Sequence, residues 1–308
     1  MKYFRAMKLH RGGKTIHRVV RFATTLVAML FILCRGSRGM AADFEIKRDL
    51  RYAEVDGKEL SLDLYLPREI RNPKLVVWVH GGAWRSGSKD RMPLTRLVEL
   101  GYAIASVDYR LTPVAKFPAN VHDIKAAIRW LRAHQEQFGY ATGKIGIAGG
   151  SAGGHLVALV GVTNGHKELE GRVGNYLDQS SAVQAIVSFY GAANLTTILK
   201  QSTPHGLSVR VPALELLLGG QPEKRVELAR LASPVFQVDA NDPPLLLIHG
   251  DQDPQMPVNQ SIELYGRYRE LGRPVRLEFI HGGAHGGKEF FDEKRIKIVK
   301  QFLDDGLK

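Results

Sequence analysis

The stretch IAGGSAGGH, residues 147–155, places a single serine among four glycines directly after the apolar run KIGIA. Gly149, Ser151 and Gly153 fit the pattern G-x-S-x-G between a predicted strand and a predicted helix. Glycines let the backbone turn sharply without a Cβ clash, so the serine hydroxyl projects at the N-terminus of that helix. The amide of Ala152 then faces any oxyanion that forms beside the serine. The stretch therefore indicates a nucleophilic serine.

Two other interpretations of this stretch are an ordinary strand-to-helix turn and a phosphate-binding loop. The letters GGSAGG lack the lysine of a P-loop and do not fit the dinucleotide pattern G-x-G-x-x-G. A hydroxyl is also a weak nucleophile that needs a base, an acid to orient the base, and hydrogen-bond donors for the developing charge. The catalytic interpretation therefore depends on finding these partners elsewhere in the chain.

We name the strand–serine–helix turn around Ser151 the nucleophile elbow, or elbow. On both sides of it, apolar runs alternate with segments of helical periodicity. Residues 44–54 and 59–67, separated by Asp56-Gly57-Lys58, predict an antiparallel hairpin. The later runs are apolar throughout, which is typical of strands buried on both faces of a parallel sheet. They occupy residues 75–80, 103–109, 144–149, 185–190, 245–250 and 275–280.

Helices are predicted between these strands. Asn120 is expected to cap a helix that ends at Gly139, and the others cover 92–100, 258–271 and 288–303. The alternation predicts an α/β fold with a mostly parallel, doubly wound sheet and an N-terminal antiparallel hairpin. Residues 191–243 are more than one crossover connection between two parallel strands needs. They hold two short helical patterns, at 213–218 and 223–232. This excess predicts a small lid-like insertion over the strand ends.

The net charge of +12 over 308 residues suggests a nucleic-acid partner until the charge is located. Residues 1–42 hold nine basic residues and no acidic one, which leaves 34 basic and 31 acidic residues in the rest of the chain. The basic excess belongs to the N-terminal segment, so no nucleic-acid binding is expected.

The N-terminal segment has the pattern of an export signal. An uncharged run of 13 residues, Phe22–Cys34, follows the basic stretch and is too short to span a membrane. Cleavage near residues 39–42 would leave 43–308 as the mature domain, exported and without a membrane span. Met7 is a second candidate start for this signal, and the alternatives to it are an uncleaved anchor and a misannotated start. Cys34 is the single cysteine, so the mature domain would have no disulfide, thiolate metal site or cysteine nucleophile.

Candidate partners for the serine follow two late strands. Asp251 and Asp253 follow one strand, and Asp253 is preferred because it lies in the loop proper. His281 and His285 follow the last strand, and His285 is preferred because its glycine-rich loop can reach Ser151. Asp251 remains a competitor. The order serine, aspartate, histidine is one in which such triads occur.

Oxyanion donors are predicted after an early strand, in WVHGGAW (78–84). The amides of Gly82 and Ala83 are expected to join that of Ala152. An ordinary glycine turn is the alternative, although Trp84 would be unusual in a solvated turn. The remaining histidines near this edge are expected to be structural: His80, His122, His155 and His249.

Five motifs carry a family resemblance: HGGAW, SVDYRLTP, FPANVHDIKAAIRWLRAH, GGSAGGHLVAL and HGDQDPQMP. Over about residues 55–305 the chain resembles the α/β-hydrolase esterases related to hormone-sensitive lipase, and most of all the bifunctional feruloyl and acetyl xylan esterases. The resemblance implies that Ser151, Asp253 and His285 are the catalytic triad.

The same resemblance places the oxyanion donors at Gly82, Ala83 and Ala152. HGGA replaces the HGGG typical of lipase-like relatives, and alanine still has an amide. Asp123 matches a family aspartate that is expected to brace the loop around Tyr109-Arg110.

The resemblance implies a serine ester hydrolase that needs no cofactor or metal. Its partners would be small-molecule or polysaccharide-linked esters, with acetyl or feruloyl groups. The alternatives are an amide hydrolase such as kynurenine formamidase or a peptidase, and a non-catalytic binding module.

Overall fold

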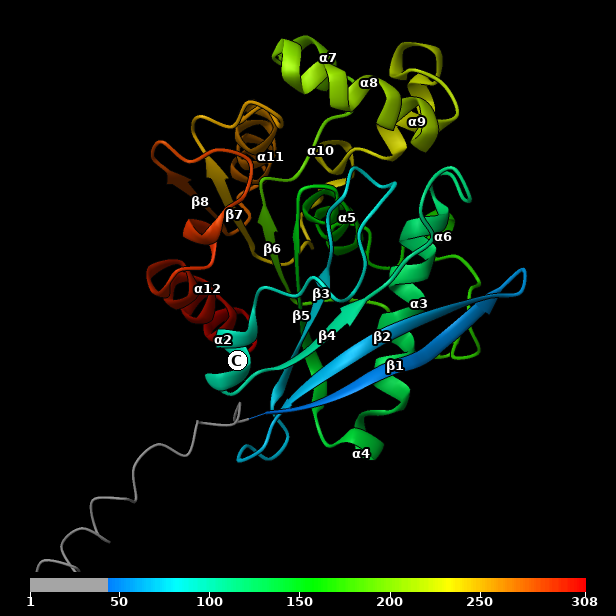
Figure 1. Ribbon diagram of the computed structural model, residues 1–308, viewed down its shortest axis with the longest axis vertical. Coiled ribbons are helices and arrows are strands. Elements are labelled where there is room, and N and C mark those ends of the chain that lie inside the picture. The colour runs from blue at the N-terminus through cyan, green and yellow to red at the C-terminus, as the bar shows by residue number, and fades with distance from the viewer. Residues whose placement is uncertain (1–43) are drawn as a thin grey trace, which may run out of the picture. The chain divides into compact units, whose positions relative to one another are not determined.

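An eight-stranded sheet runs through the computed structural model, which describes residues 44–308 (Figure 1). The strand order is β1-β2-β4-β3-β5-β6-β7-β8. β1 and β2 form the predicted hairpin, β2 pairs antiparallel with β4, and the remaining neighbours are parallel. The strands are β1 (Phe44–Val55), β2 (Lys58–Pro67), β3 (Lys74–Val79), β4 (Ala103–Val107), β5 (Ala141–Gly150), β6 (Ala185–Phe189), β7 (Leu245–Gly250) and β8 (Val275–Ile280). This arrangement confirms the predicted fold class.

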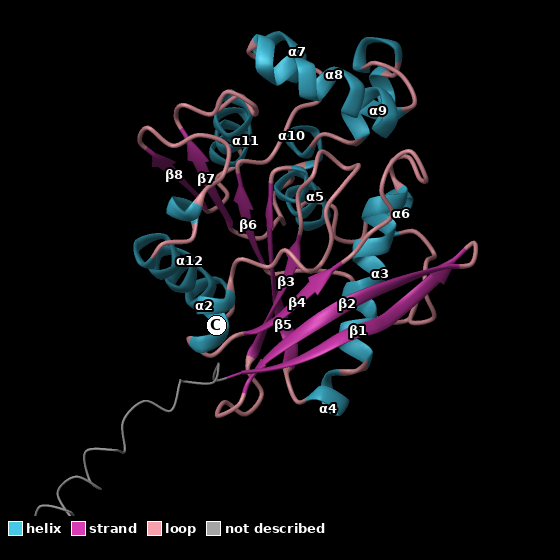
Figure 2. Ribbon diagram, viewed as in Figure 1, coloured by secondary structure: helices cyan, strands magenta, loops and turns pink. Residues whose placement is uncertain are grey.

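Helices cover both faces of the sheet (Figure 2). They are α2 (Thr95–Glu99), α3 (Ala119–Ala133), α4 (Gln135–Phe138), α5 (Ala152–Gly161), α6 (Lys167–Glu170), α7 (Ile198–Gln201), α8 (Pro204–Leu218), α9 (Val226–Leu231), α10 (Pro234–Gln237), α11 (Asn259–Glu270) and α12 (Glu293–Gly306), with 3₁₀ turns η1 (Pro222–Lys224) and η2 (Lys288–Phe290). None of the helices within 44–308 is both long and apolar enough to cross a membrane. The predicted leader, 1–42, lies outside the described residues and stays a prediction.

Successive residues of β3 enter two separate hydrophobic cores. Leu75 and Val77 pack in the core that contains residues of α3, α5, α8 and α11. Val76 and Trp78 pack in the core formed with α2 and α12. Because side chains alternate across a strand, a strand apolar throughout must have helices on both sides. This explains the continuous apolar runs.

The helix predicted from Asn120 to Gly139 differs in its details. It begins at Ala119, so Asn120 lies in the first turn, where its side chain accepts from the adjacent amide instead of capping the helix. The segment is also broken after Ala133, and α4 supplies the last turn before Gly139. Gly139 ends α4 with φ 74°, a left-handed conformation that favours glycine.

The last helix begins later than the sequence pattern predicted. Residues 288–290 form η2, and α12 starts after Asp292, whose side chain accepts from the amide of Arg295 at 2.8 Å. An aspartate in this position satisfies an amide that has no partner within the helix. The cap thus decides the start of the helix.

Residues 191–243 fold into the short helices α7 to α10 with η1. Figure 1 shows α7, α8 and α9 beyond the ends of the parallel strands. α8 extends well beyond the predicted 213–218, since Thr203 caps it by accepting from the Gly206 amide at 3.0 Å. The segment therefore lies near the edge of the sheet where ligands bind in parallel α/β folds.

Candidate active site

Ser151 occupies a sharp turn between β5 and α5. Its φ of 57° and ψ of −118° place a non-glycine residue in a sparsely populated region, which costs about 1–3 kcal/mol. The turn is possible because Gly153 has no Cβ: one built there would lie 2.1 Å from the carbonyl oxygen of Val79. The strain is therefore maintained by close backbone packing against β3.

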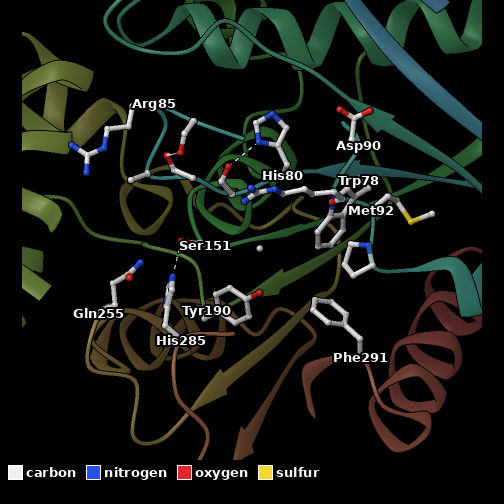
Figure 3. A pocket seen from close by; sticks show the side chains of 17 residues that line it. Trp78, His80, Arg85, Asp90, Met92, Ser151, Tyr190, Gln255, His285 and Phe291 are labelled. Atoms are coloured by element: carbon white, nitrogen blue, oxygen red, sulfur yellow. Dashed lines mark hydrogen bonds between the residues drawn. The ribbon is translucent and has the colours of Figure 1, made fainter. Parts of the chain in front are cut away.

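The hydroxyl of Ser151 lies at one end of a hydrogen-bonded chain. His285 Nε2 is 2.8 Å from Ser151 Oγ, and His285 Nδ1 is 2.7 Å from Asp253 Oδ2 (Figure 3). A carboxylate only accepts, so Nδ1 carries the proton and donates to Asp253. Nε2 is then free to accept the serine proton. Three side chains that are far apart in sequence thus meet in the arrangement that activates a hydroxyl.

The Asp253 carboxylate is fully buried and held on several sides. Its Oδ1 accepts from the amides of Gln255 and Met256, both at 2.8 Å, and His249 Nε2 lies 3.4 Å from Oδ2. Burial raises the pKa of this carboxyl, but hydrogen bonds from His249 and His285 outweigh burial and hold the pKa well below its usual range. Asp253 is therefore ionised and fixed in orientation.

The competing residues Asp251 and His281 form a separate pair. His281 Nδ1 is 2.9 Å from Asp251 Oδ2, and Asp251 Oδ1 accepts from the Gly282 amide at 2.7 Å. The His281 side chain is 87% exposed. This pair braces the loop after β8. The hydrogen-bonded chain that reaches Ser151 contains Asp253 and His285 instead.

The predicted oxyanion donors lie in the turn after β3 and at the first position of α5. Within residues 44–308, the amides of Gly82, Ala83 and Ala152 donate to no protein acceptor. Gly82 and Ala83 line the cavity with Ser151, and their φ values of 114° and 51° belong to a tight turn. A Cβ on Gly81 would lie 2.7 Å from the Gly150 carbonyl oxygen, so this turn packs directly on the elbow. These amides are free to donate to a ligand.

Trp84 fastens the same turn to the helix that follows the serine. Trp84 is fully buried, and its Nε1 donates to His155 Nδ1 at 3.1 Å. His155 Nε2 donates in turn to the Ala232 carbonyl at 2.7 Å. Burial lowers the pKa of His155 to about 4, so the ring is neutral. His155 is structural, as predicted, and Trp84 has a positioning role that the sequence only suggested.

Other residues with a structural role lie around the turn that carries Gly82 and Ala83. Tyr109 stacks on His80 with ring centroids 4.5 Å apart and donates to the His80 carbonyl at 3.1 Å. Arg110 Nη2 donates to Asp123 Oδ1 at 2.7 Å, and the Arg110 amide donates to Oδ2 at 2.9 Å. Asp123 therefore braces the Tyr109-Arg110 loop, and His122 bonds the Glu168 carbonyl on the periphery.

A cavity of about 590 Å³ opens over Ser151 (Figure 3). Its lining includes two opposite sets of side chains, which we name the polar wall (Arg85 and Gln255) and the apolar wall (Trp78, Met92 and Phe291). Tyr190 lies between the walls, and its ring is 4.9 Å from that of His285. None of the described residues of 191–243 lines the cavity.

Sequence reasoning did not identify these lining residues as functional. Tyr190 follows the strand run AIVSF directly, so its place at a carboxyl strand end was a usable signal. Arg85 comes from a loop, where periodicity gives no direction for a side chain. Met92 and Phe291 also lie in loops, although the sequence pattern predicted them within the helices 92–100 and 288–303.

The assembled groups suit nucleophilic acyl transfer. A hydroxyl, a neutral imidazole, a buried carboxylate and free amides are the components of that chemistry. Among residues 44–308, no group of three or more His, Cys, Asp or Glu side chains is arranged to hold a metal ion.

A comparison with protein-family models identifies a family, and esterases are among the relatives. The BD-FAE family model matches residues 62–268, more than half of the chain, including Ser151 and Asp253. Esterase LipC of Mycobacterium tuberculosis is 35% identical over 217 residues, which cover 69% of this chain and 52% of LipC. The chain spans about half the length of the curated relatives it matches first.

Solved structures give the same picture. A truncated carbohydrate esterase from gut microbiota superposes with a TM-score of 0.77 at 30% identity, covering 87% of this chain and 98% of the other. Esterase 2 of Thermogutta terrifontis, in a form phosphonylated by sarin, superposes with a TM-score of 0.70 at 26% identity, covering 88% and 98%. On the family match, the fold and the site together, the chain belongs to the BD-FAE family, the bifunctional feruloyl and acetyl xylan esterases of the α/β-hydrolase fold.

Proposed function

We propose that this protein hydrolyses carboxylic esters with small acyl groups through a covalent acyl-enzyme on Ser151. The observation that carries the proposal is the chain from Ser151 through His285 to Asp253, beside free backbone amides. Family membership and the esterase relatives support the same activity.

Acylation begins when Ser151 Oγ attacks the ester carbonyl carbon and His285 Nε2 takes the hydroxyl proton. The Asp253 carboxylate stabilises the imidazolium that forms. The carbonyl oxygen becomes an oxyanion, which the amides of Gly82, Ala83 and Ala152 stabilise. His285 then donates its proton to the alcohol oxygen, which leaves as the C–O bond breaks.

Deacylation repeats these steps with water as the nucleophile. His285 takes a proton from water, the hydroxide adds to the acyl carbon, and the second tetrahedral intermediate collapses. Ser151 leaves with the proton returned by His285, and the carboxylic acid is released.

The substrate class proposed is acetyl or feruloyl esters attached to a polysaccharide. The carbohydrate-esterase neighbour and the family name support this class. The apolar wall of Trp78, Met92 and Phe291 offers contact area for an aromatic acyl group such as feruloyl. The same cavity has room for the smaller acetyl group.

A substrate panel tests this proposal. Acetyl xylan, methyl ferulate, p-nitrophenyl acetate and N-formylkynurenine would be assayed with the natural chain and with Ser151→Ala. Ester hydrolysis that disappears in Ser151→Ala supports the proposal. Undiminished hydrolysis by Ser151→Ala contradicts it, and preferential cleavage of N-formylkynurenine assigns an amidase instead.

A fluorophosphonate probe provides a measurement that does not depend on the choice of substrate. It phosphonylates only an activated serine, so it is expected to label the natural chain and not Ser151→Ala. Esterase 2 of Thermogutta terrifontis has been captured phosphonylated by sarin and phosphorylated by paraoxon, which supports the choice of probe.

Export of the mature domain is proposed from the basic stretch and the apolar run Phe22–Cys34. A polysaccharide substrate outside the cell agrees with export. Fractionation of an expressing bacterium, with N-terminal sequencing of the exported form, tests it. A chain found only in the cytoplasm at full length contradicts it.

A further inference from the structure

Two arginines line the cavity without a charge partner. Within residues 44–308, the guanidinium groups of Arg85 and Arg91 make no hydrogen bond or ion pair with protein. The cavity's acid, Asp90, accepts from the Ser88 hydroxyl at 2.9 Å and lies 3.8 Å from Lys89 Nζ. The positive charge of the cavity is therefore not balanced by its own lining.

A third arginine stands behind the polar wall. Arg210, from α8, is fully buried, and its three guanidinium nitrogens have no hydrogen-bond partner among the described residues. Its guanidinium carbon is 6.0 Å from the ring centroid of Trp84, the residue next to Arg85. A buried cation without a partner is costly, because it has lost its hydration without an ion pair to replace it.

The charge of Arg210 interacts with the charges of Asp253 and Arg85. Burial lowers the pKa of Arg210 to about 10, Asp253 opposes this change, and the positive charge of Arg85 adds to it. Asp253 is already bonded to His285 and close to His249. Arg210 and the ionised Asp253 behind the polar wall carry opposite charges, which leaves the charge of Arg85 itself as the excess.

The polar wall and the apolar wall lie opposite each other across the cavity (Figure 3). In this view Arg85 and His285 lie on opposite sides of Ser151, and Gln255 lies next to His285. His285 Nε2 has to reach the leaving alcohol oxygen to protonate it. The leaving alcohol oxygen therefore lies next to His285, in a cavity that Arg85 and Gln255 also line.

We infer, resting on the proposed ester hydrolysis, that Arg85 binds a carboxylate carried by the ester substrate, as in an acylated uronic acid. The planar guanidinium presents paired N–H donors that match a carboxylate. Gln255 also lines the cavity and offers a further amide donor. Uronic acids are sugars of polysaccharides that carry this group.

The test compares two esters that differ only in this carboxylate. Methyl glucoside and methyl glucuronoside, each acetylated at the 3-hydroxyl, would be assayed at low ionic strength with the full chain. The natural chain is expected to hydrolyse the uronate with about tenfold higher kcat/KM, because charge-assisted hydrogen bonds are strong. Added salt is expected to reduce this preference.

Three variants locate the effect. Arg85→Gln is expected to bring the ratio of the two kcat/KM values close to one, and Arg85→Lys to keep part of the preference because it keeps the charge. Arg269→Gln is the matched control, since this exposed arginine of α11 lies outside the cavity. The control is expected to keep the full ratio.

Failure of this inference and failure of the proposed function are distinguishable. Equal hydrolysis of both esters by the natural chain overturns the carboxylate assignment and leaves ester hydrolysis standing. A preference that disappears in Arg91→Gln and survives in Arg85→Gln also overturns the assignment. Hydrolysis of neither sugar ester, nor of p-nitrophenyl acetate, overturns the proposed function itself.

Discussion

The indole of Trp84 donates to the imidazole of His155 at 3.1 Å and thereby joins the oxyanion turn to the helix that carries the nucleophile. His155 stands four positions after Ser151 in GGSAGGH. Two of the oxyanion donors, Gly82 and Ala83, thus lie on a different segment from the attacking hydroxyl, and this buried hydrogen bond joins the two segments. Catalysis depends on their spacing, because displacement of a donor weakens its stabilisation of the oxyanion.

Trp84→Phe is expected to lower the free energy of unfolding by about 1–3 kcal/mol, because it leaves the buried His155 Nδ1 without a donor. We also expect kcat for p-nitrophenyl acetate to fall about tenfold or more with KM less affected, since the donors act on the transition state. Urea unfolding and steady-state kinetics measure both.

The control for this variant is Trp130→Phe. Trp130 is also largely buried, and it stacks on His134 with centroids 3.9 Å apart, away from the cavity. It is expected to change stability while leaving kcat close to that of the natural chain. A natural kcat in Trp84→Phe would contradict the proposed coupling.

The buried His155 makes stability depend on pH. Its pKa is about 4 in the folded protein and about 6.5 in an unfolded chain, so between these values only the unfolded state binds the proton. Stability is therefore full above about pH 6.5 and is lost as the pH falls toward 4, by about 3 kcal/mol. Urea unfolding at several pH values measures this loss.

His155→Gln is expected to flatten the pH dependence over this interval, at a lower overall stability. His205→Gln is the matched control, because His205 is exposed on α8 and should leave the curve unchanged. A pH dependence that survives in His155→Gln would assign it to other groups.

Two aspartates two positions apart allow a paired test of the triad. Asp253→Asn is expected to reduce kcat about 10⁴-fold, because an amide favours the wrong tautomer of His285. Asp251→Asn should reduce it only slightly, since Asp251 bonds the exposed His281. Equal losses in the two variants, measured with p-nitrophenyl acetate, would refute the assignment.

Much of the architecture could be predicted from the sequence because local patterns fix it. Apolar runs marked the strands, and G-x-S-x-G with its flanking strand and helix marked the elbow. The choice of Asp253 over Asp251 was less secure, because both follow β7 and only the fold decides which one faces His285.

The cavity walls could not be predicted in this way. Trp78 was visible as part of a strand, but Arg85 and Phe291 come from loops far apart in the sequence. Arg210 lies outside the predicted helical patterns at 213–218 and 223–232 and could be recognised as unusual only from its burial, since an arginine is ordinarily exposed. Substrate selectivity therefore depends on the part of the molecule that is least visible in the sequence.

The elbow's strain can be tested at Gly153. A Cβ there would lie 2.1 Å from the Val79 carbonyl oxygen, with no flexible side chain to give way. Gly153→Ala is therefore expected to lower the free energy of unfolding by about 1–3 kcal/mol or more and to displace Ser151, which abolishes labelling by a fluorophosphonate. The matched variant is Gly266→Ala in α11, where a Cβ meets nothing within 4 Å. That variant should raise the free energy of unfolding by about 0.5–1 kcal/mol, because alanine favours the helix, and should leave labelling intact. Normal labelling of a folded Gly153→Ala chain would show that the elbow does not depend on this close packing.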